Sequence, residues 1–141
     1  MRELPRKLTV DELAELFEGR TRFIERLAEL DDPLGRAREI AATLIGEEKR
    51  EVLDAHPAIG GTALSARSAA EQGDDEAPEL EELNRRYEER FGFRFVVFVN
   101  RRPKREIVPI LRERIERTRD EELSTALDEL VSIAEDRWQR S

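Results

Sequence analysis

Apolar residues recur through most of the chain at the three- and four-residue spacing of amphipathic α-helices. The first such stretch follows Thr9-Val10-Asp11-Glu12, a capping-box sequence, and ends at Gly19. A second stretch follows the candidate cap Thr21 and breaks at Asp31-Asp32-Pro33. Further helices are predicted over residues 34–45, 47–55, 79–90, 103–117 and 121–138, with a short one over 65–72.

Glycine, proline and a cap set the boundaries of these predicted helices. Gly46 ends the helix over 34–45. Pro103 suits the first turn of the helix over 103–117, and Pro109 predicts a kink inside it. Asp120 is the predicted cap of the last helix.

Two segments depart from the helical pattern. Residues 56–62 form a predicted loop, because Pro57 disfavours helical geometry at His56 and two glycines follow. Residues 91–99 are β-like and hold four aromatic residues and one charge, so we expect them to be buried. The pattern predicts an all-α fold, a single domain over residues 1–141 with about seven to eight helices and one short extended segment.

Composition narrows the possible partners. Apolar residues make up 38% of the chain and charged residues 41%, and the helical spacing of the apolar ones favours a packed core over disorder. The net charge of −8 argues against binding to nucleic acid or an anionic membrane, which needs a basic face. No apolar run reaches the roughly 20 residues that span a bilayer, and no apolar stretch follows the N-terminus. We therefore expect no nucleic acid, no membrane and a cytoplasmic location.

The chain has no cysteine and a single histidine. Disulfides, thiolate metal sites and cysteine nucleophiles are excluded, and the scattered carboxylates lack the spacing of a zinc or iron site. No Gly-rich phosphate loop, nucleotide fingerprint or nucleophile elbow is present. We expect an enzyme without metal or cofactor, or a plain binding module.

His56 is the first candidate for chemistry. A lone histidine is more often structural than catalytic, but this one lies in a Pro/Gly loop, where backbone can approach a ligand closely. It follows the end of a predicted helix, a position that favours its protonated form. Because its ordinary pKa is near neutrality, His56 is the candidate acid or base.

Two further segments each allow two interpretations. In Ser68-Ala69-Ala70-Glu71-Gln72 the Ser-x-x-Glu spacing is a capping box, unless the segment faces the His56 loop and contributes Glu71 or Gln72 to a site. Residues 91–99 form a core segment, or an extended backbone whose N–H and C=O groups bind a flat ligand with amide edges. Spacing alone permits both interpretations in each case.

Three motifs occur in order along the chain: Ala55-His56-Pro57-Ala58-Ile59-Gly60, Ser68-x-x-Glu71-Gln72, and Leu83-Asn84-x-x-Tyr87-x-x-Arg90-Phe91-Gly92-Phe93-x-Phe95-Val96. With them the chain resembles the 2-oxo-4-hydroxy-4-carboxy-5-ureidoimidazoline (OHCU) decarboxylase family over nearly its whole length. The resemblance implies a compact helical fold, no metal or organic cofactor, and commonly a homodimer. It also implies conversion of OHCU, a small ureidoimidazoline substrate, to S-allantoin in urate breakdown.

The resemblance assigns site residues position by position. The catalytic histidine matches His56, with Pro57 beside it, and the Ser/Glu/Gln set matches Ser68, Glu71 and Gln72, of which Glu71 is the second catalytic candidate. The C-terminal active-site arginine matches Arg137, with Arg140 as the nearby alternative. In relatives the backbone after the Phe-Gly-Phe motif lines the substrate ring, which points to Phe95, Val96, Val97, Phe98 and Val99.

The chain departs from the family pattern at Ala58, Gly61 and Phe98, and these positions bear on substrate fit. Two other functions stay open. A hydrolase of a neighbouring ureide step lacks an obvious water-activating device in this sequence. An inactive helical dimerisation or adaptor module would have His56, Glu71 and Arg137 far apart or facing solvent.

Overall fold

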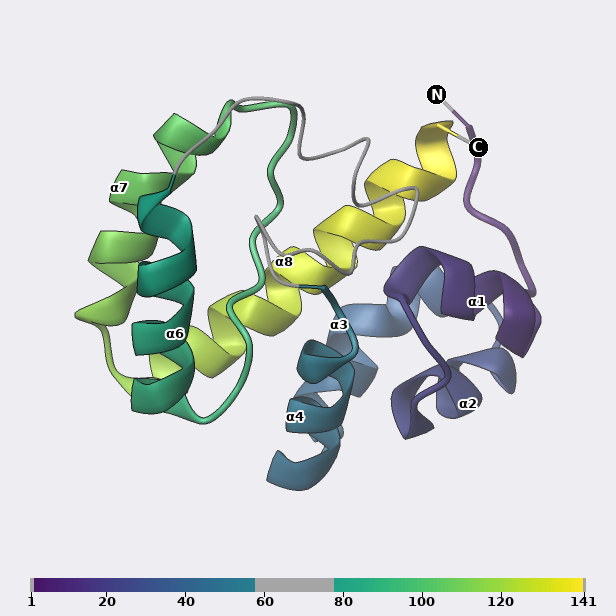
Figure 1. Ribbon diagram of the computed structural model, residues 1–141. Helices are drawn as coiled ribbons and strands as arrows, with labels where there is room; N and C mark the ends of the chain where they lie inside the picture. Colours follow the sequence, from purple (N-terminus) through teal and green to yellow (C-terminus); the bar gives the residue numbers. More distant parts are fainter. Residues whose placement is uncertain (1, 58–77, 141) are drawn as a thin grey trace.

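The computed structural model describes residues 2–57 and 78–140, which form seven α-helices and no strand (Figure 1). The predicted all-α class is confirmed for these residues. The short helix predicted over 65–72 lies outside them. The helices are α1 (Val10–Phe17), α2 (Arg22–Ala28), α3 (Pro33–Thr43), α4 (Gly46–Asp54), α6 (Glu79–Phe91), α7 (Lys104–Ile115) and α8 (Arg119–Arg140).

The long helix α8 runs through the middle of the molecule, and the other helices gather on its two sides (Figure 1). On one side α6 and α7 pack against each other, and on the other α8 packs against α1, α3 and α4. The side chains of α8 that face these neighbours are apolar or engaged in polar contacts inside the molecule. The first residues of the chain return to the end of α8, where Arg2 N–H donates to Gln139 Oε1 at 2.7 Å.

The N-terminal caps of α1 and α2 are those that the sequence predicts. Thr9 Oγ1 accepts from the Glu12 N–H at 3.1 Å, and the Glu12 carboxylate accepts from the Thr9 N–H at 3.0 Å, which completes the capping box. Thr21 Oγ1 accepts from the Ile24 N–H at 3.5 Å. These bonds satisfy amides that a helix start leaves unpaired, so both helices begin where their sequences allow it.

Two predicted boundaries are wrong for the same physical reason. Gly46 does not end α3 but is the first residue of α4, because the Glu48 carboxylate reaches back to the Ile45 N–H at 3.2 Å. Asp120 does not cap α8, because Thr118 does: its Oγ1 accepts from the Glu121 N–H at 3.2 Å, and Glu121 accepts from the Thr118 N–H at 3.1 Å. In both places a glutamate–amide bond starts the helix earlier than predicted.

The segment from Phe93 to Val99 runs extended from the end of α6 past α8 toward the start of α7 (Figure 1). No described residue pairs with it as a strand. Its predicted burial is confirmed, since Phe93, Phe95, Val96, Val97 and Val99 are each 7% exposed or less. The rings of Phe93 and Phe95 lie 5.9 and 5.2 Å from the ring of Tyr87 on α6, so aromatic packing anchors the segment.

Helix α7 continues through Pro109 from Lys104 to Ile115. The kink expected at this residue stays a prediction. Among the described residues no helix is both long enough and apolar enough to cross a membrane.

Candidate active site

His56 follows the last turn of α4, and its side chain is almost completely buried, with 5% exposed. Its backbone N–H donates to the Leu53 carbonyl at 3.2 Å, so the end of α4 carries the residue. The ring atom Nε2 is buried and has no hydrogen-bond partner among the described residues. Buried polar atoms are nearly always paired in folded proteins, and an orphan imidazole nitrogen therefore marks a candidate ligand site.

Burial, and to a smaller extent the neighbouring arginines, keeps the imidazole of His56 neutral. Burial, together with the positive charges of Arg137 and Arg94, lowers the pKa of His56 to about 4, although the Glu18 carboxylate opposes the shift. The expectation that the helix end favours the protonated form is therefore wrong. The ring is buried away from water. The Asp54 and His56 carbonyls at this helix end already accept hydrogen bonds from Arg94, so they do little to stabilise a protonated imidazole. At neutral pH the imidazole can accept a proton.

Arg137 reaches the same region from α8, and its side chain is 2% exposed. Its Nη1 donates to the Leu16 carbonyl at 3.2 Å and to the Glu15 carbonyl at 3.4 Å. Its Nη2 lies 3.1 Å from the Glu18 carboxylate. The last turn of α1 and its C-cap residue thus hold a buried guanidinium near His56. Figure 1 places the ends of α1 and α8 on the same side of the molecule.

Arg140, the alternative to Arg137, occupies a different environment. Its side chain is 40% exposed and pairs with Asp136 one turn away on the same helix at 2.5 Å. Of the two arginines, the structure brings Arg137 close enough to His56 for their charges to interact. The adaptor alternative expects His56, Glu71 and Arg137 to lie apart or to face solvent. His56 and Arg137 are both buried, and Glu71 lies outside the described residues.

Arg94 connects the extended segment to the end of α4. Its Nη1 donates to the Asp54 carbonyl at 3.1 Å and to the His56 carbonyl at 2.5 Å, while its backbone N–H donates to Asp54 Oδ1 at 3.0 Å. No motif or spacing in the sequence assigns a role to Arg94. Its signal was present all the same: it is the one charge in an otherwise apolar aromatic segment.

The backbone of the predicted substrate-binding segment divides into paired and unpaired groups. The Val96 carbonyl accepts from Arg114 Nη1 at 2.9 Å, and the Phe98 and Val99 carbonyls accept from Arg102 at 2.6 and 2.9 Å. No hydrogen bond joins the peptide groups of Phe95 or Val97 to any described residue. These are the groups that extended backbone without a strand partner offers to a ligand.

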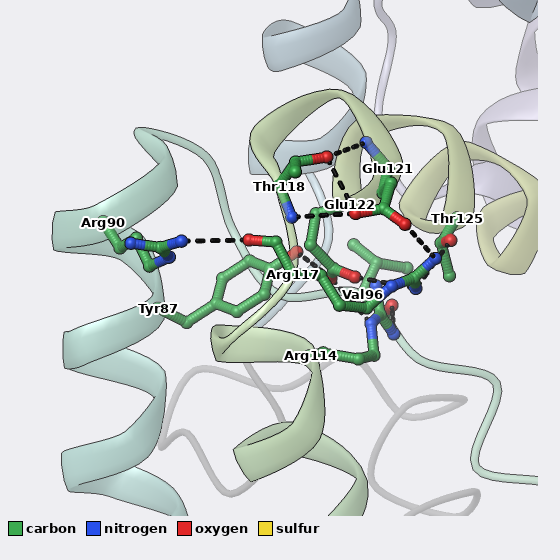
Figure 2. A network of polar contacts seen from close by, with 9 residues as sticks. All are labelled: Tyr87, Arg90, Val96, Arg114, Arg117, Thr118, Glu121, Glu122 and Thr125. Atoms are coloured by element: carbon green, nitrogen blue, oxygen red, sulfur yellow. Dashed lines mark hydrogen bonds and ion pairs between the residues drawn. The ribbon is translucent and has the colours of Figure 1, made fainter.

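A buried polar network holds this segment, and Figure 2 shows its members coming together from α6, α7, α8, the turn between α7 and α8, and the segment itself. Glu122 on α8 is fully buried and accepts from Tyr87 Oη at 2.6 Å and from Arg114 Nε at 2.7 Å. Its second oxygen accepts from Arg117 Nη1 at 2.9 Å. Arg114 also lies over the Phe95 ring, and its bond to the Val96 carbonyl connects the extended segment to Glu122. Burial and the bond to Glu122 raise the pKa of Tyr87 well above its usual range.

Three predicted site residues, Ser68, Glu71 and Gln72, lie outside the described residues, as do Ala58 and Gly61. Pro57 is described and half-buried beside His56. Phe98 is half-buried, whereas Phe95, Val96, Val97 and Val99 are buried. In the described part of the chain no group of three or more histidine, aspartate or glutamate side chains is placed to hold a metal ion.

A pocket of about 340 Å³ lies elsewhere, between α3, α4 and α8, around Ala42 and Leu123. Arg38 on its rim is already engaged by Asp128 at 2.6 Å and Glu135 at 2.7 Å. None of the predicted site residues lines it. The chemistry therefore points to the His56 region and not to this pocket.

Comparison with known proteins identifies the family of the chain. Residues 2–139 match the sequence model of the OHCU decarboxylase family. The 2-oxo-4-hydroxy-4-carboxy-5-ureidoimidazoline decarboxylase of Haloferax volcanii is 33% identical over 144 residues, covering 89% of this chain and 84% of the relative. The uric acid degradation bifunctional protein PucL of Bacillus subtilis is 29% identical, and the match covers 95% of this chain but 30% of that protein.

A solved structure shares the fold. The crystal structure of an OHCU decarboxylase in the presence of (S)-allantoin superimposes with a TM-score of 0.73 at 25% identity, covering 89% of this chain and 94% of the other. The family match over almost the whole chain, the relative of similar length and this structural likeness agree with one another. The chain belongs to the OHCU decarboxylase family.

Proposed function

We propose that His56 is the proton-transfer group of the decarboxylase reaction in this chain. As a family member the chain is a carboxy-lyase that converts OHCU to S-allantoin in urate degradation. One observation carries the proposal for His56: its ring is buried, neutral at neutral pH, and has an Nε2 atom without a partner among the described residues. A neutral imidazole has a ring nitrogen lone pair that can take up a proton, and its lowered pKa favours the return of that proton to the substrate.

The reaction needs little from the protein beyond binding and proton transfer. The carboxylate of OHCU sits on a carbon next to a ring C=N bond. When the C–C bond breaks and CO2 leaves, the electron pair flows onto the ring nitrogen, so the substrate supplies its own electron sink. The protein then has to hold the ring and deliver a proton to one face of the carbon, which fixes the enantiomer formed.

The described residues divide this work by position. His56 takes the proton of the substrate hydroxyl or acts at its carboxylate. Arg137, buried and held by the end of α1, binds a carboxylate or carbonyl oxygen of the substrate. The peptide groups of Phe95 and Val97 are proposed to meet the amide edges of the ring, with Val96, Phe98 and Val99 lining it.

Residues outside the described part of the chain are proposed to complete the site. Glu71 and Gln72 orient the hydroxyl and the ureido group, with Ser68 in support and Pro57 against the ring. Positioned acid–base catalysis of this kind contributes about 10²- to 10⁴-fold to the rate. Variants that lose His56 or Glu71 should therefore lose rate by a factor in this range.

The test is chiroptical. The active protein should accelerate the appearance of S-allantoin from freshly generated OHCU, seen as growing optical rotation, whereas protonation of the carbon without the protein has no preferred face. His56→Asn should reduce this rate about 100-fold or more, and Arg85→Gln, a change of an exposed α6 residue, should leave it unchanged. Near-normal production of S-allantoin by His56→Asn would exclude the proposed role.

We also propose that the chain works as a homodimer in the cytoplasm. The family resemblance supports the dimer. A single large apolar side chain at the start of α4, Ile45, is 59% exposed and is one surface that a second copy would cover.

A further inference from the structure

The end of α4 is held from outside the helix by one side chain. The last carbonyls of an α-helix have no partner within the helix. Here Arg94 Nη1 donates to the Asp54 carbonyl at 3.1 Å and to the His56 carbonyl at 2.5 Å. The Arg94 backbone N–H donates to Asp54 Oδ1 at 3.0 Å. Three hydrogen bonds therefore join residue 94 to residues 54–56.

Arg94 is itself fixed at both its backbone and its guanidinium. Its neighbours Phe93 and Phe95 are each 2% exposed and pack against Tyr87, so the backbone at residue 94 is anchored in the core. Its Nε donates to Glu88 Oε1 on α6 at 3.1 Å. Because this side chain is anchored at both ends, it fixes the end of α4 relative to α6 and the extended segment.

The backbone of His56 is consequently held on both sides. Its N–H donates to the Leu53 carbonyl at 3.2 Å, and its carbonyl accepts from Arg94. Pro57, which follows, restricts the backbone geometry of His56 further. With these constraints the direction of the imidazole depends only on its own side-chain torsions.

We propose that Arg94 is a positioning residue for His56, holding the backbone at the end of α4 so that the imidazole stays buried beside Arg137. This inference rests on the proposed role of His56. Arginine suits the task because its planar fork donates in several fixed directions, whereas the lysine ammonium is a point charge on a flexible stem. Arg94 touches no reacting atom in this scheme, so its effect passes entirely through His56.

The single histidine of the chain provides a direct readout, because its ring protons titrate in an NMR spectrum without assignment ambiguity. Among the described residues, the charged groups that act on this ring are Arg137 from α8, Glu18 from the end of α1 and Arg94 from the extended segment. Arg94→Gln removes the charge and the guanidinium bonds to the Asp54 and His56 carbonyls, whereas Arg94→Lys keeps the charge but loses the planar fork that makes these two bonds. The backbone N–H bond to Asp54 remains in both variants. Comparing the two separates position from electrostatics.

If Arg94 positions His56, both variants should release the ring toward solvent and raise its pKa by about one unit or more toward the ordinary value. Both should also lower kcat about 10- to 100-fold, the usual cost of a misplaced catalytic group, with KM changed only a few-fold. Recovery of the wild-type pKa and kcat in Arg94→Lys would show that charge alone matters and overturn the proposal. So would an unchanged His56 titration in Arg94→Gln.

Arg90→Gln is the matched control. Arg90 also donates to a backbone carbonyl near a helix end, from Nη2 to the Arg117 carbonyl at 3.0 Å, but its partner lies at the end of α7. Its loss should lower stability to a similar extent and leave the His56 titration and kcat at wild-type values. A shift of His56 in this control equal to that in Arg94→Gln would refute a specific role for Arg94.

A milder variant guards against loss of folding. Glu88→Gln keeps Arg94 in place but weakens its anchor on α6, so it should move the His56 pKa in the same direction by a smaller amount. No movement at all in a folded Glu88→Gln and Arg94→Lys pair would overturn the proposal. The NMR titration of His56 does not require turnover, so it tests Arg94 independently of the decarboxylation assay. If the wild-type protein fails to accelerate OHCU decarboxylation, the proposed function is refuted, but the titration still decides the role of Arg94.

Discussion

The buried guanidinium of Arg137 and the carboxylate of Glu18 form an ion pair with 3.1 Å between Nη2 and Oε1. Glu18 is the C-cap residue of α1 and has a φ of 61°, a left-handed conformation that residues with a side chain rarely adopt. The strained backbone turns this carboxylate toward Arg137. Strain of this kind is found preferentially at functional sites, and here it places an acidic group beside the proposed substrate-binding arginine.

We predict that Glu18→Gln lowers the free energy of unfolding by about 1–3 kcal/mol, because a hydrogen bond to a charged group is replaced by a weaker one. It should also lower the pKa of His56 further, since the Glu18 carboxylate raises it in the wild type. Urea denaturation and NMR titration measure the two effects. Asp136→Asn, which breaks the surface pair with Arg140, should cost less than about 0.5 kcal/mol, and an equal cost for the two variants would contradict the burial argument.

Burial of His56 predicts a specific dependence of stability on pH. The folded-state pKa is about 4, below the ordinary value of about 6.5, so between these values the unfolded chain binds one proton more than the folded chain. Stability from this residue is therefore fully present above about pH 6.5 and is lost as pH falls to about 4, by about 3 kcal/mol in all.

The pH prediction is checked by denaturing the wild type and His56→Asn over this range. Asparagine does not titrate, so the difference in unfolding free energy between the two proteins should shrink or change sign as the pH falls from 7 to 4. Parallel stability curves would mean that the imidazole is not held in the neutral form.

The network around Glu122 predicts unequal costs for its members. Glu122→Gln leaves Arg114 and Arg117 without their shared anion in the interior and should lower stability by about 3–5 kcal/mol. Tyr87→Phe removes one hydrogen bond and should cost about 1–2 kcal/mol. Chemical denaturation of both variants, with Thr125→Ala as a mild control on the rim of the network, tests the ranking.

Glu71 separates the catalytic interpretation from the capping one. If Glu71 only caps a helix, Glu71→Gln should cost about 1 kcal/mol or less and leave turnover near wild type. If it is catalytic, as proposed, turnover should fall on the order of 100-fold with little change in melting. The double variant with His56→Asn should lose less than the product of the single losses, because groups that act on one proton path are not independent.

Light scattering at high protein concentration tests the proposed homodimer. The expected mass is twice the 16.4 kDa of the chain. Ile45→Glu, which places a charge on the exposed apolar position, should shift the equilibrium toward monomer if that surface is part of the contact. A monomeric mass for the wild type would refute the dimer without affecting the catalytic proposal.

The helices could be predicted from sequence because each buries an apolar stripe, and stripes are visible as spacing. Their starts were harder. Thr118 and Glu48 begin α8 and α4 through side-chain bonds to backbone amides, and Asp120 and Gly46 offered equally plausible signals nearby. In both places the deciding bond is local, a glutamate carboxylate that accepts the backbone N–H of the residue three positions before it.

The site divides in the same way. His56 stood out because a unique residue type lay in a Pro/Gly loop. Glu122 gave no such signal, since a glutamate in the first turn of a helix is ordinarily a solvated residue. It is buried because two arginines neutralise it, Arg114 from α7 and Arg117 from the turn between α7 and α8. The position of the Glu18 carboxylate likewise depends on a left-handed backbone conformation and on a partner, Arg137, far along the chain. The residues next to Glu18 in the sequence predict neither.

The arginine contacts that shape the site have a consequence for ionic strength. Arg94, Arg102, Arg114 and Arg137 each donate to at least one uncharged backbone carbonyl, and the ion pairs of Arg114 and Arg137 are buried. At 1 M salt the Debye length falls to about 3 Å, which weakens exposed ion pairs such as Arg85 with Glu82 but leaves short hydrogen bonds to carbonyls in place. We therefore expect the geometry around His56 to persist at salt concentrations that weaken the exposed ion pairs. Added salt should break these surface pairs well before it changes the positions of His56 and Arg137.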